Sequence, residues 1–189
     1  KATMTINGGI VECNTYDDGI NAATSLIFNG GYIFSHASNN DAIDSNGTIT
    51  VNGGVVLASG TNAPEEGFGC DNNQFAVNGG IIIGTGSANS SVTSSSQPYA
   101  SVSSVSVTQG RYLAVKNSSG EVMFSYRCPN TVNGASVLLS SPAFTSSSHT
   151  LMYGVTSVSG ASESYFDGSF KVGGTASGGS SKSFTPQSR

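Results

Sequence analysis

Charged residues are scarce in this chain of 189 residues, where they make up 10% of the sequence. The first 110 residues contain a single basic side chain, Lys1, against eight acidic ones, whereas residues 111–189 hold six basic and three acidic side chains. A surface that binds nucleic acid needs positive charge, so we expect no nucleic-acid partner for the first part. No apolar run approaches the ~20 residues that cross a bilayer, so we also expect no membrane span.

Cysteine and histidine are also rare. The three cysteines, Cys13, Cys70 and Cys128, lack the spacing of a zinc site. An odd number allows at most one disulfide: Cys70 with Cys128 is one interpretation, and three buried thiols are the other. The two histidines, His36 and His149, are too few to argue for a Ser–His–Asp triad.

The tripeptide Asn-Gly-Gly, in contrast, is frequent. It occurs four times, and the successive Asn residues are spaced by 22, 23 and 26 positions: Asn7, Asn29, Asn52 and Asn78. A repeat of this length is typical of a stacked solenoid. Composition rich in Gly, Ser, Thr and Asn is compatible with disorder, but the regular apolar alternation within each repeat favours packed strands.

Each Asn-Gly-Gly lies between two short segments with strand periodicity. Two apolar residues precede each Asn at an interval of two: Met4/Ile6, Leu26/Phe28, Ile49/Val51 and Phe75/Val77. A second strand follows each Gly pair, and its apolar residues point to both faces, so we expect another part of the chain to cover it. The sequence therefore predicts an all-β fold, a parallel β-helix of about four coils in which the four Asn side chains form an internal amide ladder.

Acidic residues recur at the next corner of each repeat. Asp18 and Asp41 both lie 11 residues before the following repeat Asn, and Asn21 and Asp44 both lie eight before it. Glu66 takes the equivalent place in the third coil. We expect Asp18, Asp41 and Glu66 to form one vertical row, and Asn21, Asp44 and Asp71 another beside it, with ~4.8 Å between coils.

Stacked carboxylates without basic neighbours repel one another by ~3 kcal/mol per pair at ~5 Å and an effective dielectric near 20. A hard divalent cation relieves this repulsion, and calcium accepts six to eight oxygens in irregular geometry. We therefore predict Ca²⁺ as the cofactor, against the alternative of a solvated acidic edge. The candidate ligands are the acidic and amide residues of these corners: Asp17, Asp18, Asn21, Asp41, Asp44, Glu65, Glu66 and Asp71.

The repeats end near residue 96, so we expect one region at 1–96 and a β-rich region at 97–189 that packs on the solenoid. Residues 85–97 are predicted to be a loop, and Gly173–Arg189 a polar tail. Strands are expected within 101–107, 111–115, 121–126, 137–139, 151–155 and 165–172, with a hairpin turn at Asn117–Gly120.

The Asp-Gly-Ile-Asn and Asp-Ala-Ile-Asp corners, the repeated apolar-Asn-Gly-Gly and Gly67–Asp71 together resemble the calcium-dependent carbohydrate-binding β-helix family of bacterial surface proteins. The resemblance covers residues 1 to about 90. It implies a right-handed, pectate-lyase-like fold and non-catalytic binding of plant cell-wall or uronic-acid polysaccharide, with calcium between protein and sugar carboxylates. Glu66 departs from the Asp of the other coils.

Catalysis is not expected, because a uronan lyase needs a Lys or Arg base beside its calcium, and the repeats offer only Lys1 and His36. Arg111, Lys116 and Arg127 lie in the other region. The chain begins inside a repeat, which suggests a fragment of a longer, secreted precursor located outside the cell or on its surface. The alternative function is a structural subunit of an extracellular fibre or surface layer that self-associates through its exposed β-helix end.

Overall fold

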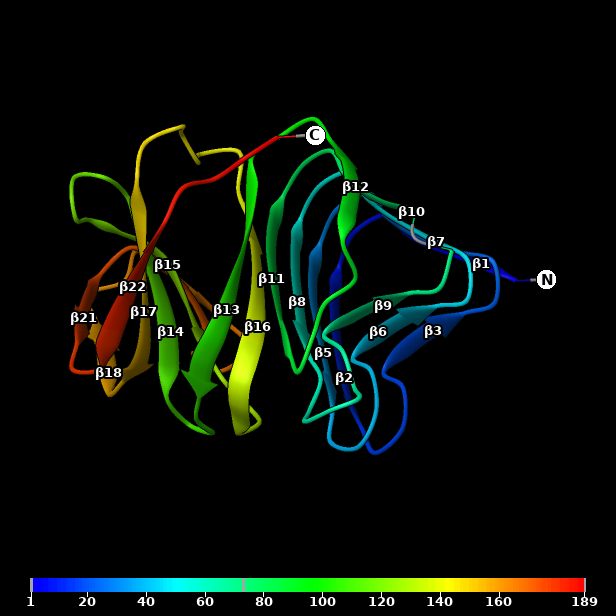
Figure 1. The fold of residues 1–189 in the computed structure, drawn as a ribbon, viewed down its shortest axis with the longest axis horizontal. Coiled ribbons are helices and arrows are strands. Elements are labelled where there is room, and N and C mark those ends of the chain that lie inside the picture. Colours follow the sequence, from blue (N-terminus) through cyan, green and yellow to red (C-terminus); the bar gives the residue numbers. More distant parts are fainter. Residues whose placement is uncertain (1, 73, 189) are drawn as a thin grey trace.

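The computed structural model describes residues 2–72 and 74–188, which form β-strands, turns and bends but no helix (Figure 1). Parallel strands stack as a β-solenoid of about four turns, so the predicted β-helix is confirmed. The first solenoid sheet consists, in spatial order, of β1 (Thr3–Ile6), β4 (Ser25–Phe28), β7 (Thr48–Val51), β10 (Gln74–Val77) and β12 (Val92–Ser95).

The second solenoid sheet is mixed. Its parallel part contains β2 (Ile10–Thr15), β5 (Tyr32–Ala37), β8 (Val55–Ser59) and β11 (Ile81–Gly86), and the antiparallel strands β16 (Val132–Ser140) and β13 (Tyr99–Val107) extend it beyond β11. The third sheet consists of β3 (Ile20–Ala22), β6 (Ile43–Ser45) and β9 (Phe68–Cys70).

The remaining strands are antiparallel. A six-stranded sheet runs in the order β19 (Glu163–Tyr165), β20 (Phe170–Val172), β15 (Val122–Arg127), β14 (Tyr112–Lys116), β17 (His149–Val155) and β22 (Ser180–Phe184). A small ladder pairs β18 (Ser157–Ser159) with β21 (Thr175–Ser177). The hairpin predicted around Asn117–Gly120 joins β14 to β15.

Period-two apolar residues of the three solenoid sheets fill the interior. Leu26 pairs with Ile49 and Ile49 with Phe75, so equivalent side chains stack from coil to coil. All three are fully buried or nearly so, and complete burial of such a side chain contributes about 1.5–3 kcal/mol. The inward-facing residues of the third sheet are also buried: Ile20, Ala22, Ile43, Ser45, Phe68 and Cys70.

The amide ladder forms on the outside of the solenoid. Nδ2 of Asn29 donates to Oδ1 of Asn7 at 2.8 Å, Asn52 to Asn29 at 2.8 Å, and Asn78 to Asn52 at 2.9 Å. Since all four residues are exposed, the prediction of an internal ladder is wrong in position. Each Asn follows an inward-facing residue and therefore points outward at the corner.

A second apolar core lies between the outer face of the second solenoid sheet and the six-stranded sheet. Phe34, Leu57 and Ile83 pack there against Phe124 and Tyr126. The strand with two apolar faces is thus covered by the C-terminal region, as predicted. The cover does not reach the first coil, where Ile10 is 71% exposed.

Three expectations for residues 85–189 need correction. The predicted loop contains β12, which adds a strand to the first solenoid sheet. The single strand predicted at 165–172 is instead a hairpin, in which residues 166–169 form the turn between β19 and β20 and Phe166 and Asp167 have positive φ values of 53° and 49°. The predicted polar tail forms β21 and β22, and β22 pairs with β17.

Candidate functional site

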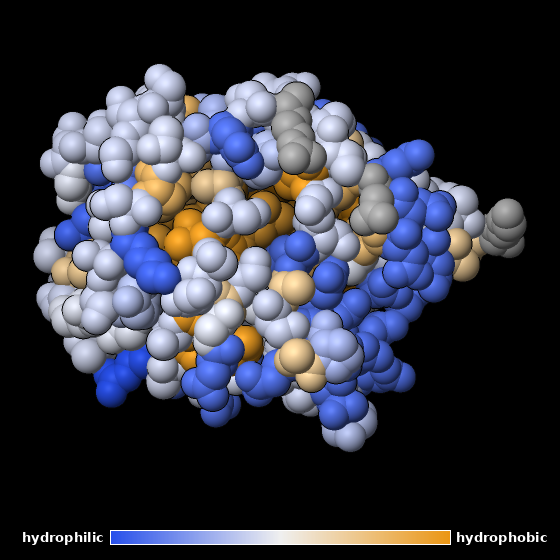
Figure 2. Space-filling view, in the orientation of Figure 1, coloured by the Kyte–Doolittle hydropathy of each residue, from blue (hydrophilic) through white to orange (hydrophobic). Residues whose placement is uncertain are grey.

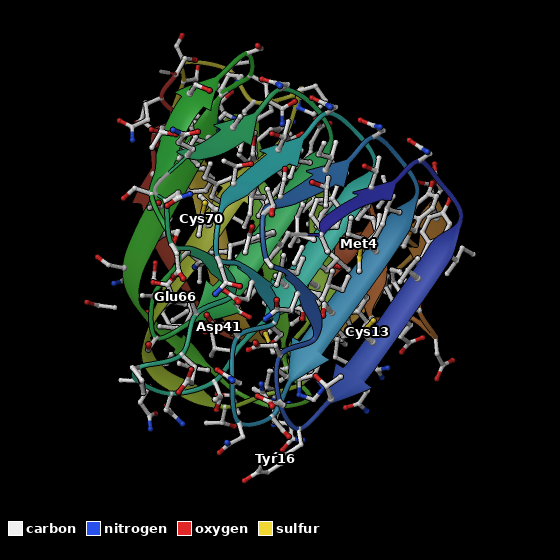
Figure 3. The ribbon with its side chains drawn as sticks, turned by 90° about the vertical axis from the view of Figure 1, so that its right-hand side faces the viewer. Met4, Cys13, Tyr16, Asp41, Glu66 and Cys70 are labelled. Carbon is white, nitrogen blue, oxygen red and sulfur yellow. The ribbon has the colours of Figure 1, made fainter. Side chains whose placement is uncertain are left out.

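The predicted first row of acids lies at the corner that leads into the third solenoid sheet. Ile20 pairs with Ile43 and Ile43 with Phe68, which aligns Asp18, Asp41 and Glu66 in successive coils. Backbone bonds hold the same alignment at the corner itself: Gly19 N donates to Asp41 O at 3.1 Å, and Ala42 N to Glu66 O at 3.2 Å. In Figure 3, Asp41 and Glu66 lie next to each other.

The second predicted row is only partly correct. Asn21 pairs with Asp44, but the partner of Asp44 in the third coil is Gly69, not Asp71. Asp71 instead lies one position beyond Cys70, and Nδ2 of Asn46 donates to its carboxylate at 3.5 Å. Asp71 therefore lies two positions beyond Gly69, opposite Asn46 rather than Asp44.

Gly69 leaves room for the two aspartates of the middle coil. A Cβ atom at this position would collide with the carboxylate of Asp41 and would lie 3.0 Å from Oδ1 of Asp44. Both carboxylates therefore reach into the space above Gly69. We name Asp41, Asp44 and Glu66 the acidic cluster.

Each carboxyl of the acidic cluster has a raised pKa. Burial is the main cause for all three, and neighbouring carboxylates add to it; the pKa of Asp41 rises to about 7 and that of Asp44 to about 6. The charges that raise these pKa values come from Asp18, Glu65 and Asp71 and from the cluster itself, and no basic side chain of the described residues is among the causes that lower them. Residues 2–110 contain no Lys or Arg.

Amide and hydroxyl groups, rather than cations, solvate these acids. Nδ2 of Asn21 donates to Asp18 at 2.6 Å and to Asp44 at 2.9 Å. The Ser90 hydroxyl donates to Glu66 at 2.9 Å and accepts from Cys70 N. Sequence reasoning missed Ser90, because it lies in the stretch interpreted as a loop.

Asp17 and Glu65, which directly precede Asp18 and Glu66 in the sequence, have different surroundings. Asp17 is exposed, and the amide of Asn40 donates to it at 2.6 Å, which lowers its pKa. Glu65 is anchored by its backbone: its carbonyl accepts bonds from Ser87 N at 3.1 Å and Ser87 Oγ at 2.8 Å. The negative charge of its carboxylate contributes to the raised pKa of Asp41.

Among the described residues, no group of three or more His, Cys, Asp or Glu side chains already has the arrangement of a metal site. The structure thus brings the predicted acids together on one corner without converging their oxygens on a single point. A cation bound here would draw the carboxylates inward. Carboxylate and amide oxygens of this kind are the ligands that calcium accepts.

The candidate catalytic bases are dispersed. Lys1 lies outside the described residues. His36 is on β5, where Nε2 is 2.8 Å from Oδ1 of Asn130. His149 is buried, and Nδ1 is 2.8 Å from Ser147 O.

All three cysteines are free thiols. Cys70 belongs to the solenoid interior and Cys128 to the second core, on the other side of the second solenoid sheet. The disulfide considered between them is therefore wrong.

No family model, curated protein or solved structure matches this chain. The described residues include no helix long and apolar enough to cross a membrane. The arguments for function that follow depend on the geometry and charge of the described side chains.

Proposed function

We propose that this protein is an extracellular, non-catalytic module that binds a uronic-acid polysaccharide through calcium. The observation that carries the proposal is the acidic cluster: three neighbouring carboxyl groups of two adjacent coils that have raised pKa values, with no basic side chain of the described residues among the groups that shift them. Calcium would supply the missing positive charge. It would be held by Asp41, Asp44 and Glu66, with Asp18 and Asn21 beside them.

The position of the acids favours a polymer ligand. The row runs along the solenoid with one acid per coil, and hydrophilic side chains cover that half of the molecule in Figure 2. A calcium ion on an exposed edge keeps coordination positions for outside oxygens. The carboxylates of a polyuronate would take these positions and extend across several coils.

An exposed aromatic ring near the row also supports a sugar ligand. Tyr16 is 73% exposed and directly precedes Asp17 and Asp18. An aromatic ring presents a rigid apolar face with a polar tip, which suits a sugar ring that has apolar faces and hydroxyl edges. An extracellular location agrees with the proposal, because the calcium sites of extracellular modules work at about 10⁻⁴–10⁻³ M calcium.

Retention of the protein on immobilised polygalacturonate tests the proposal. We expect retention in about millimolar calcium, its loss in excess EDTA, and its loss in the Asp41→Asn/Asp44→Asn variant. Glu121→Gln is the matched control, because it removes a carboxylate from the exposed turn between β14 and β15. Retention that is equal with and without EDTA would contradict calcium dependence.

The first coil favours self-association as a second candidate function. Its strands β1, β2 and β3 each stand at the end of a sheet, and Ile10 and Met4 are 71% and 41% exposed. Unpaired strand edges with apolar side chains pair readily with other strands. The protein would then be a structural subunit, with calcium as a staple between its coils.

Ile10→Lys should weaken this association, because it places a charge on the exposed edge strand. Size-exclusion chromatography with light scattering would show a mass that rises with concentration for the unmodified protein and falls towards the monomer for the variant. Ser118→Lys, at the exposed turn after β14, is the control. A monomer at every concentration would contradict the second candidate.

A further inference from the structure

A polar groove lies between the solenoid and the C-terminal region, and none of its lining residues belongs to the acidic cluster. Its volume is about 400 Å³. The solenoid contributes Glu12 and Asn14 from β2 and Phe34 and His36 from β5, and the opposite wall contains Gln109 and Arg127. The volume lies within the range of about 300–1,000 Å³ found for small-molecule sites.

Arg127 is held in a defined orientation. Its Nη2 donates to Asp167 O at 3.1 Å and to Ser169 Oγ at 3.2 Å, and its backbone N donates to Ser169 O at 2.7 Å. These side-chain bonds use Nη2, and no bond from Nη1 or Nε to another described residue accompanies them. A guanidinium with free N–H groups is well suited to bind a carboxylate with two parallel hydrogen bonds.

The hydrogen bonds of Asn130 assign the tautomer of His36. Nδ2 of Asn130 donates to Ala37 O at 2.9 Å and to Gly60 O at 2.8 Å, so its Oδ1 must be the atom that faces His36. Nε2 of His36 therefore carries the proton. In the neutral ring Nδ1 is then an acceptor.

The walls of the groove have complementary chemistry. Arg127 offers donors and a positive charge, Glu12 and Nδ1 of His36 offer acceptors, and the amides of Asn14 and Gln109 offer both. Phe34 is 7% exposed and packs against Tyr126 and Phe166, so it contributes only a small apolar edge to the groove. A ligand that fits this set has one carboxylate and several hydroxyls.

We propose that this groove binds a single uronic-acid residue without calcium. The carboxylate of the sugar pairs with Arg127, and its hydroxyls donate to Glu12 and His36. This inference rests on the uronate specificity of the proposed function and adds a second site for the same class of sugar. It involves neither the acidic cluster nor a metal ion, so the two sites fail independently.

Isothermal titration calorimetry in excess EDTA, with monomeric galacturonate as the probe and galactose as its neutral counterpart, tests the groove. We expect galacturonate to bind and galactose to bind at least about tenfold more weakly, since a charge-assisted pair contributes about 1.5–3 kcal/mol. Arg127→Gln should weaken galacturonate binding by a similar factor. The Asp41→Asn/Asp44→Asn variant should bind galacturonate as the unmodified protein does.

A second variant covers the case in which Arg127→Gln fails to fold. Glu12 is exposed on an edge strand, so Glu12→Gln should fold normally. It should weaken both sugars, because it replaces one of the two acceptor oxygens by an NH₂ group that cannot accept a hydroxyl hydrogen. Absence of galacturonate binding in EDTA, equal binding of galactose, or binding unchanged in Arg127→Gln or in Glu12→Gln would overturn the proposal. Calcium-dependent retention on polygalacturonate reports on the acidic cluster alone.

Discussion

Replacing Asp41 and Asp44 together by asparagine is expected to raise the melting temperature of the calcium-free protein at about pH 8 and to remove its stabilisation by calcium. The folded protein raises the pKa of Asp41 to about 7 and that of Asp44 to about 6, chiefly by burial. The ordinary value is near 3.9. The folded state therefore favours the protonated carboxyls, and the charged forms at high pH oppose folding.

The direction of the pH dependence follows from these two pKa values. Their contribution to stability is fully present below about pH 4 and is lost as the pH rises through about 6 to 7. Because both carboxyls are half exposed, solvent screening limits the expected difference to about 1–2 kcal/mol, or roughly 2–8 °C in melting temperature for a chain of this size.

Thermal unfolding followed by circular dichroism checks this prediction. In EDTA, the unmodified protein should melt at a lower temperature at about pH 8 than at about pH 4, and this difference should be smaller in the double variant, where Glu66 still has a raised pKa. Calcium should raise the melting temperature of the unmodified protein only, because it binds the folded state through these carboxylates. An equal calcium effect on both proteins would show that the ion binds elsewhere.

The solenoid was predictable from the sequence because its core repeats locally. Each coil places apolar side chains two apart before Asn-Gly-Gly, so Leu26, Ile49 and Phe75 identify one another without knowledge of the fold. The error at Asp71 has a physical origin as well. Counting back eight residues from Asn78 reaches Cys70, because the link between β9 and β10 is one residue longer than in the other coils, and Asp71 is the acid next to that position. Only the strand pairing reveals that Gly69 opposes Asp44.

The C-terminal region and the groove depended on contacts that no local pattern encodes. Strand β16 pairs with β11 from about fifty residues away in the sequence, and the serine-rich β13 follows it. His36 belongs to a repeat and Arg127 to the C-terminal region, and no spacing in the sequence relates the two residues. Only the packing of the six-stranded sheet on the solenoid places both on one groove.

A graded loss of stability is expected when alanine replaces glycine at three positions of the Asn-Gly-Gly corners. Gly8 has open space where alanine would place its Cβ and no positive φ, Gly9 has the same space but a φ of 89°, and Gly54 has a φ of 86° and a Cβ position 2.5 Å from Gly31 O. Alanine should cost less than about 0.5 kcal/mol at Gly8 and about 1–2 kcal/mol at Gly9, where only the left-handed backbone is unfavourable.

Gly54→Ala should have the largest effect, above about 3 kcal/mol, because the added carbon meets backbone atoms of the preceding coil in addition to the strain of its positive φ. Those atoms cannot move aside without lengthening the bond from Val55 N to Gly31 O, which is 2.8 Å. Chemical denaturation of the three variants measures the series directly. Equal losses at Gly9 and Gly54 would mean that backbone strain alone requires the second glycine, and that close stacking of the corners does not.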